Sequence, residues 1–237
     1  MNPNAPILEF ADVTIAAAAR EHAGLSHAGM RLLPGALSLV QLEPGHEQSP
    51  LADLAAGLLD PEEGRVLFQG EAWSAMSPAQ VLQRRAQIGR VFDGHGWVSN
   101  LNVNENVTLA QRHHTRRPDT EILAEAEALA RAFGLDELPK IRPALVAPRD
   151  LRRAEWIRGF LGCPLLILLE RPMQDVPLEH LPRLLGAVQE ACARKAAVLW
   201  LTDKDQVWQN PNLRGAMRCA MRGQTLRTAA APVRAGN

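Results

Sequence analysis

The sequence predicts an α/β protein with a mainly parallel core sheet. Two short apolar runs, 165–169 and 197–201, have the continuous hydrophobicity of strands that are buried on both faces. A predicted helix precedes each run, at 149–161 and at 178–195, and this alternation of helix and buried strand is typical of parallel sheets. With 237 residues, the chain is long enough for one large domain.

The first part of the chain predicts three strands and one short helix. Residues 7–16 alternate in part between apolar and polar side chains, which indicates a first strand. Residues 17–34 contain a second, weaker strand that ends at a proline-glycine turn. The apolar run 37–42 predicts a third strand, covered on both faces, and 51–59 predict a short helix.

The middle of the chain predicts two strands and two helices. Residues 65–69 and 88–92 read as strands. Between them, 77–80 open a helix with proline in its first turn and a capping-box glutamine three residues after the serine. Strongly helical composition predicts a helix over 120–133, and the polar segment 113–118 before it is predicted as a connector.

Composition excludes several classes of protein. The chain has 26 basic and 26 acidic residues, so no net charge attracts it to nucleic acid or to an anionic membrane surface. No window reaches the ~18 apolar residues of a membrane span, and the first residues lack the pattern of a signal peptide. The histidines and the three cysteines lack the spacing of metal ligands. We therefore expect a cytoplasmic protein that binds no metal and no nucleic acid.

The segment between the third strand and the first helix has the layout of a phosphate-binding P-loop, G-x-x-x-x-G-K-[ST], without its chemistry. In an ungapped alignment Leu42 replaces the first glycine, and Glu47 replaces the second. Gln48 replaces the lysine, so the positive charge for phosphate is missing. The hydroxyl residue Ser49 is in place. The degenerate nucleotide-binding positions are therefore predicted to be Gly45, Glu47, Gln48, Ser49 and Asp93.

Four framework segments carry a resemblance to a known family. They are 61–71, 75–77, 88–92 and 99–109, the last of which is similar to an N-L-T-V-x-E-N-V element. Together with the order of the elements over roughly 7–227, they resemble the ATP-binding subunit of an ABC transporter. The branch that serves lipid-trafficking permeases of the Mla/Mce type is the most similar.

This resemblance implies the P-loop NTPase-like ABC ATPase fold, which has a mainly parallel core sheet, an N-terminal antiparallel β part and a helical subdomain. It implies a single ABC-ATPase-like domain over 1–237. The core lobe is expected from 1–92 and 160–227, and the helical lobe from 93–159. Residues 228–237 are predicted to be a frayed tail.

The resemblance also assigns positions to the catalytic machinery, and this chain departs from each. The family's Q-loop glutamine corresponds to Asp93, and its switch histidine corresponds to Asp203. The Asp-Glu pair after the Walker B strand appears as Glu170 and Arg171. Arginine cannot accept a proton near neutral pH, so no catalytic residue is expected here. We expect Arg171 to pair with Glu170 or with another neighbouring acid.

The family's signature, L-S-G-G-Q, is also replaced. Its place is taken by Val146, Ala147, Pro148, Arg149 and Asp150. In the family, the signature glycines and the helix that follows them hold a phosphate bound by the opposite subunit. Proline and arginine provide no such surface, although Arg149, Arg152 and Arg153 are expected to form a basic cluster that could meet an anion.

The combined losses predict a pseudo-ATPase that acts as a structural or regulatory component of a membrane transport complex, with lipid as one candidate cargo. No cofactor is expected, although the altered pocket allows weak binding of Mg-ATP. The resemblance implies that a coupling helix of a membrane permease docks near 93–98. Asp93 and Trp97 are the expected contacts, with Trp97 as an exposed aromatic anchor. An ordinary core position is the other interpretation of Trp97.

Two alternatives stay open. The chain could be the noncatalytic half of an asymmetric ABC ATPase pair that still holds ATP weakly, or a soluble adaptor without a permease. As a subunit it would form a homodimer or a heterodimer with another ABC subunit. Its expected place is then on the inner face of the cell membrane.

Overall fold

The structure is a computed structural model that describes residues 5–17, 23–44, 49–94, 96–213 and 215–228. The strands are β1 (Leu8–Ile15), β2 (Leu25–Leu32), β3 (Leu37–Gln41), β4 (Glu63–Phe68), β5 (Glu71–Ala72), β6 (Ile88–Val91), β7 (Leu166–Glu170), β8 (Ala197–Thr202), β9 (Met217–Arg222) and β10 (Thr225–Thr228). The α-helices are α1 (Leu51–Ala55), α2 (Pro78–Arg85), α3 (Val103–His114), α4 (Asp119–Ala132), α5 (Pro148–Phe160), α6 (Leu181–Ala193) and α7 (Asp205–Trp208).

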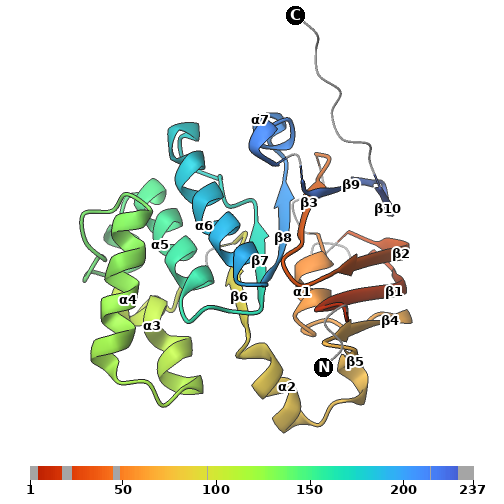
Figure 1. The fold of residues 1–237 in the computed structure, drawn as a ribbon, viewed down its shortest axis with the longest axis horizontal. Coiled ribbons are helices and arrows are strands. Elements are labelled where there is room, and N and C mark those ends of the chain that lie inside the picture. Colours follow the sequence, from red (N-terminus) through yellow and green to blue (C-terminus); the bar gives the residue numbers. More distant parts are fainter. Residues whose placement is uncertain (1–4, 18–22, 45–48, 95, 214, 229–237) are drawn as a thin grey trace, which may run out of the picture.

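A six-stranded sheet with the order β10-β9-β3-β8-β7-β6 forms the centre of the molecule (Figure 1). Neighbours from β9 to β6 are parallel, and only β10 is antiparallel to its neighbour. All residues of β7 and β8 are buried, as their continuous apolar sequences require. The predicted α/β fold with a mainly parallel sheet is confirmed.

Alternate residues of the central strands enter two different hydrophobic cores, because successive side chains of a strand point to opposite faces. In β7, Ile167 and Leu169 pack with the helices α3 to α6, whereas Leu166 and Leu168 pack with the N-terminal strands and α1. Figure 1 shows these two groups on opposite sides of the central strands. The sheet therefore holds the two halves of the molecule together.

The N-terminal strands form a separate antiparallel sheet with the order β2-β1-β4-β5. Buried and exposed residues alternate along β2, so one face packs on the core and the other faces outward. The predicted antiparallel part is confirmed, and β1 begins and ends within one residue of the expected 7–16.

The helices α3, α4 and α5 all come from the segment predicted as the helical lobe (Figure 1). α4 and α5 match the predicted 120–133 and 149–161 within one residue. The sequence interpretation missed α3, although Asn102 and Glu105 form a capping box at its start. The expected connector 113–118 is shorter, because α3 continues to His114. The division into lobes at 92/93 and 159/160 stays a prediction.

The C-terminal part contains two strands, β9 and β10, that the sequence did not predict. β9 pairs in parallel with β3, and β10 returns antiparallel along β9 after Gly223. Thr228 is the last residue of β10, so the prediction of a frayed tail is wrong for this residue. The rest of the predicted tail, 229–237, lies outside the described residues. α6 is shorter than the predicted 178–195, because 178–180 form a 3₁₀ turn.

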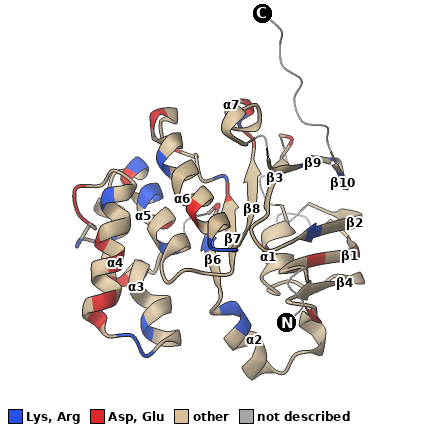
Figure 2. Cartoon of the chain, viewed as in Figure 1, with Lys and Arg blue, Asp and Glu red and all other residues tan. Residues whose placement is uncertain are grey.

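Charged residues of both signs are distributed over both sheets and the helices (Figure 2), which agrees with the zero net charge. No helix in the described part of the chain is long and apolar enough to cross a membrane.

Close backbone contact between β6 and α5 makes a testable prediction. A Cβ atom on Gly89 would lie 1.9 Å from the carbonyl oxygen of Gly159. Gly89→Ala should therefore lower the free energy of unfolding by about 3 kcal/mol, because neither backbone can move freely. Urea denaturation followed by tryptophan fluorescence measures this change.

Gly29→Ala in β2 is the matched control, since a Cβ atom there would meet nothing within 4 Å. It should change the stability by less than about 0.5 kcal/mol. Equal stability of the two variants would contradict the assigned packing of α5 on β6.

Candidate functional site

The carboxyl ends of three neighbouring core strands bring the predicted catalytic positions together. β6 is followed, after one residue, by Asp93, and β8 is followed by Asp203. Between them, β7 ends at Glu170 and is followed by Arg171. Because β6, β7 and β8 are parallel neighbours, these side chains lie at one edge of the sheet. Ligands of open α/β sheets bind at this edge.

Arg171 lies between two carboxylates, and we call this group the Arg171 cluster (Asp93, Arg171 and Asp203). Arg171 Nε donates to Asp93 Oδ1 at 2.7 Å, and Nη2 lies 2.7 Å from the same oxygen. Nη1 lies 3.6 Å from Asp203 Oδ2. The Arg171 and Asp93 side chains are each 18% exposed. The prediction that Arg171 pairs with a neighbouring acid is confirmed, and Asp93 and Asp203 are its acidic partners among the described residues.

A second ion-paired group, the Arg90 cluster (Asp53, Arg90 and Glu170), lies at the same edge. Arg90 Nε donates to Glu170 Oε1 at 2.5 Å, and Nη1 donates to Asp53 Oδ1 at 2.7 Å. Burial lowers the pKa of Arg90, but its two acidic partners outweigh this effect and the pKa is raised. Burial raises the pKa of Glu170, while the hydrogen bond from Arg90 opposes that shift.

Sequence reasoning missed the role of Arg90, which was noted only as part of the framework segment 88–92. The sequence did contain a signal for this role. Arg90 is a charged residue in a short strand, and a charged side chain that becomes buried in a sheet needs a partner. Its partners are 37 and 80 residues away in the sequence, so they could not be identified from spacing.

The residues around Glu170 do not fit a Mg²⁺ ion. The resemblance gives this position the role of ordering the metal, yet its Oε1 atom accepts a hydrogen bond from Arg90. A cation would have to displace a guanidinium that is 11% exposed. Within the described residues, no group of three or more His, Cys, Asp or Glu side chains is placed to hold a metal ion.

The P-loop-like segment is only partly described, because Gly45, Glu47 and Gln48 lie outside the described residues. Ser49 is buried, and its hydroxyl has no hydrogen-bond partner in the described part of the chain. On the other side of this segment, Glu43 Oε1 lies 3.3 Å from Arg222 Nε. The helix that follows, α1, has five residues and therefore a small dipole for holding an anion.

The signature-like residues lie at the start of α5. Ala147 is the N-cap and makes no side-chain capping bond, and Pro148 is the first helical residue. Asp150 accepts a hydrogen bond from Arg153 at 2.5 Å and lies 3.5 Å from Arg149. Val146 packs against the helical core.

The expected anion-binding cluster of Arg149, Arg152 and Arg153 does not form. Arg152 is fully buried, where it pairs with Glu155 at 2.6 Å. Arg153 is also buried and donates to the carbonyl oxygen of Gly134 at 2.6 Å. Of the three arginines only Arg149 is exposed, since the other two satisfy acceptors inside the helical region.

Arginine side chains hold the segment that follows β6, which we call the post-β6 segment (92–94 and 96–98). Arg152 donates to the carbonyl oxygens of Phe92 and Asp93, at 2.5 and 3.2 Å. Arg158 donates to the carbonyl oxygen of Gly96 at 2.6 Å. Together with the Arg171–Asp93 pair, these bonds connect the described residues of the segment to α5 and to the end of β7.

Trp97 is half-buried rather than exposed, so the expectation of an exposed aromatic anchor is wrong in that respect. Its ring packs against the helical core and lies under the Arg158 guanidinium, 4.8 Å from the ring centre. The carboxylate of Asp93 is bound by Arg171. Contact of Asp93 or Trp97 with a permease stays a prediction.

A groove of about 670 Å³ lies beside the post-β6 segment, between α2 and α3. Its apolar lining residues are Leu82, Val98, Leu109 and Ala110. Its polar lining residues are Asn106, His113, His114 and Arg158. Leu82 and Val98 are 57% and 43% exposed, so the groove presents apolar surface to solvent.

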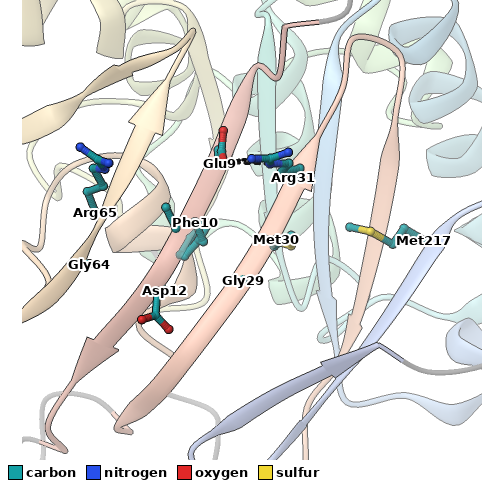
Figure 3. Close-up of a pocket in the computed structure, with 10 residues that line it drawn as sticks. Glu9, Phe10, Asp12, Gly29, Met30, Arg31, Gly64, Arg65 and Met217 are labelled. Atoms are coloured by element: carbon teal, nitrogen blue, oxygen red, sulfur yellow. Dashed lines mark hydrogen bonds and ion pairs between the residues drawn. The ribbon is translucent and has the colours of Figure 1, made fainter.

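Another hollow, of about 910 Å³, lies on the outward face of the antiparallel sheet (Figure 3). Glu9 and Arg31 in this hollow pair with each other at 2.7 Å, as the dashed line in Figure 3 shows. None of the predicted site residues lines it. We therefore place the candidate site at the carboxyl edge of the core sheet, with the groove beside it.

Known proteins with similar sequences are ATP-binding components of transport systems. The chain is 26% identical over 196 residues to the lipoprotein-releasing system ATP-binding protein LolD of Granulibacter bethesdensis. This match covers 81% of this chain and 82% of LolD. It is 27% identical over 138 residues to the intermembrane phospholipid transport system ATP-binding protein MlaF of Escherichia coli K12. That match covers 58% of this chain and about half, 51%, of MlaF. No family model matches.

Solved structures share the fold over nearly the whole chain. The dimeric bacterial ABC transporter cassette MJ0796 matches with a TM-score of 0.81 and 17% identity, over 92% of this chain and 96% of that one. An ATP-binding subunit of an ABC transporter matches with a TM-score of 0.77 and 18% identity, over 93% and 88% of the two chains. The chain is thus related to the ATP-binding subunits of ABC transporters, the Mla-type branch included, and has the fold of their nucleotide-binding domain.

Proposed function

We propose that this chain is a subunit of an ABC-type transport system that does not hydrolyse ATP and acts through its binding surfaces. The Arg171 cluster carries the proposal. The position of the catalytic acid holds a guanidinium, and the two neighbouring catalytic positions hold the carboxylates that bind it. A general base contributes typically 10²–10⁴-fold to a rate, and arginine cannot replace it.

The Arg90 cluster supports the same proposal. A side chain that orders Mg²⁺ must be available to the metal's water shell, whereas Glu170 is bound by Arg90 and buried. We therefore assign no cofactor to this chain. Weak nucleotide binding stays an alternative, which calorimetry with Mg-ATP tests.

The groove beside the post-β6 segment supports a docking role. The resemblance places the coupling helix of a permease near 93–98, and the groove offers apolar surface at that place. The names of LolD and MlaF refer to lipoprotein release and phospholipid transport, which supports a lipid-related cargo. The subunit would work on the inner face of the cell membrane, as one half of a homodimer or a heterodimer.

Nucleotide turnover tests the proposal directly. The purified chain should release no phosphate from Mg-ATP above the rate of the buffer. The variant that combines Glu47→Gly with Gln48→Lys should gain affinity for Mg-ATP in calorimetry, because it removes an acid and restores a positive charge. It should still show no turnover, since Arg171 remains.

Measurable hydrolysis by that variant would show that the assignment of Arg171 is wrong. Saturable binding of Mg-ATP by the unaltered chain, without turnover, would favour the noncatalytic half of an asymmetric pair. The absence of binding at millimolar ATP would favour a scaffold or an adaptor.

The Arg171–Asp93 pair should control the mobility of the post-β6 segment. Arg171→Asp places three carboxylates together, so the amides of 93–98 should exchange hydrogen about tenfold faster, which corresponds to about 1.4 kcal/mol. The charge swap Asp93→Arg with Arg171→Asp should recover much of the protection. Hydrogen-exchange mass spectrometry measures both effects.

Arg194→Gln, at the exposed end of α6, removes one positive charge far from the site and serves as the control. It should leave the exchange of 93–98 unchanged. If Arg171→Asp also left that exchange unchanged, the ion pair would not hold the segment.

The groove should be required for association with a membrane partner. Leu82→Asp places a charge on exposed apolar groove surface, so membrane proteins that co-purify with the tagged chain from its native cells should be lost. Leu33→Asp alters a similarly exposed leucine outside the groove lining and should retain them. Quantitative mass spectrometry of detergent-solubilised complexes makes the comparison. Retention of every partner by the Leu82→Asp chain would contradict the docking role.

A further inference from the structure

The wall of the groove contains an unbalanced positive charge. Glu155 is fully buried, and its Oε2 atom pairs with Arg152 Nη1 at 2.6 Å. Its other oxygen, Oε1, lies 3.9 Å from Arg158 Nη2. Two arginines thus share one buried carboxylate, which leaves about one positive charge without an acidic partner among these three residues.

Arg158 is the arginine of this group that lines the groove. Its guanidinium lies over the rings of Phe92 and Trp97, at 4.9 and 4.8 Å from their centres. Nη1 donates to the carbonyl oxygen of Gly96, whereas the buried Nε and Nη2 atoms have no hydrogen-bond acceptor among the described residues. Burial and the charges of Arg152 and Arg90 lower the pKa of Arg158, although Glu155 opposes this shift. A carboxylate brought next to Arg158 would therefore stabilise its charged form, which burial and the neighbouring arginines disfavour.

The rest of the groove lining also favours an acidic ligand over a basic one. His113 and His114 lie on its rim, at the end of α3, and none of the described lining residues is acidic. The exposed apolar contribution comes from Leu82 in α2 and from Val98 in the post-β6 segment, which both line the groove. Apolar walls with one buried cation match an amphipathic helix whose inward face carries a carboxylate.

We propose that the groove binds a helical segment of a membrane-embedded protein and that a carboxylate on this segment pairs with Arg158. The inference rests on the proposed docking function and specifies the chemistry of the partner. Because the post-β6 segment is already held by Arg152, Arg158 and Arg171, its conformation does not have to be ordered on binding. We therefore expect the partner to bind without nucleotide.

The probe is a stapled amphipathic helix of about 14 residues, a length that needs the staple to stay helical in water. It consists of Leu, Ala and Gln with one central Glu, and its twin has Gln in place of that Glu. Fluorescence anisotropy with the full chain, without nucleotide, should give an affinity for the Glu peptide about tenfold above that for the twin. Arg158→Gln should remove this preference, and Arg194→Gln should keep it.

A second pair of variants does not alter the buried charge network. Leu82 is exposed, so Leu82→Lys and Leu82→Glu should both fold. The lysine should strengthen the preference for the Glu peptide by about 2-fold to 5-fold, and the glutamate should weaken it by a similar factor. Circular dichroism and thermal melting confirm that each variant is folded before its affinity is compared.

Equal affinity of the chain for the two peptides overturns the inference, and so does the absence of binding by both at millimolar concentration. A preference that survives Arg158→Gln in a folded variant also overturns it. The proposed function fails on other measurements, namely ATP turnover by the unaltered chain or full recovery of membrane partners with Leu82→Asp. The two failures can therefore be distinguished.

Discussion

Burial of the six-stranded sheet on both faces is the constraint on which the rest of the structure depends. Every residue of β7 and β8 is buried, and alternate side chains enter two separate cores. Charged groups can therefore be accommodated only where these strands end, because an unpaired charge inside the sheet would be too costly. At the carboxyl edge, Glu170, Arg171 and Asp203 stand at or just after the ends of these strands, and this edge is the candidate site.

The residues at this edge form a compatible set of charges. An arginine introduced alone at the end of β7 would be a partly buried cation without a partner, which destabilises a fold. Asp93 and Asp203 supply the partners, and Arg90 does the same for Glu170 and Asp53. Both arginines of the edge therefore have acidic partners among its own side chains. Through Asp93, the pair with Arg171 connects the end of β7 to the post-β6 segment.

Much of the fold could be predicted because its signals are local. Apolar runs identified β3, β7 and β8, and helical composition with a glycine stop identified α4. Two elements, α3 and β9, were not predicted, and the reasons differ. The segment of α3 was interpreted through its family motif, so its capping box was overlooked. β9 has a weak pattern of its own and is stabilised by pairing with β3, which is distant in the sequence.

By itself the sequence determined the α/β class, the relationship to ABC subunits, and which residue type stands at each catalytic position. Only the tertiary structure decided which groups these residues meet. Arg171 and Asp93 are 78 positions apart, and Arg90 and Glu170 are 80 positions apart, so no spacing rule links them. Tertiary packing also buries Arg152 and Arg153 and covers part of Trp97, which the sequence did not predict. The physical reason is that ion pairing and desolvation depend on distances in space, which packing of the whole chain sets.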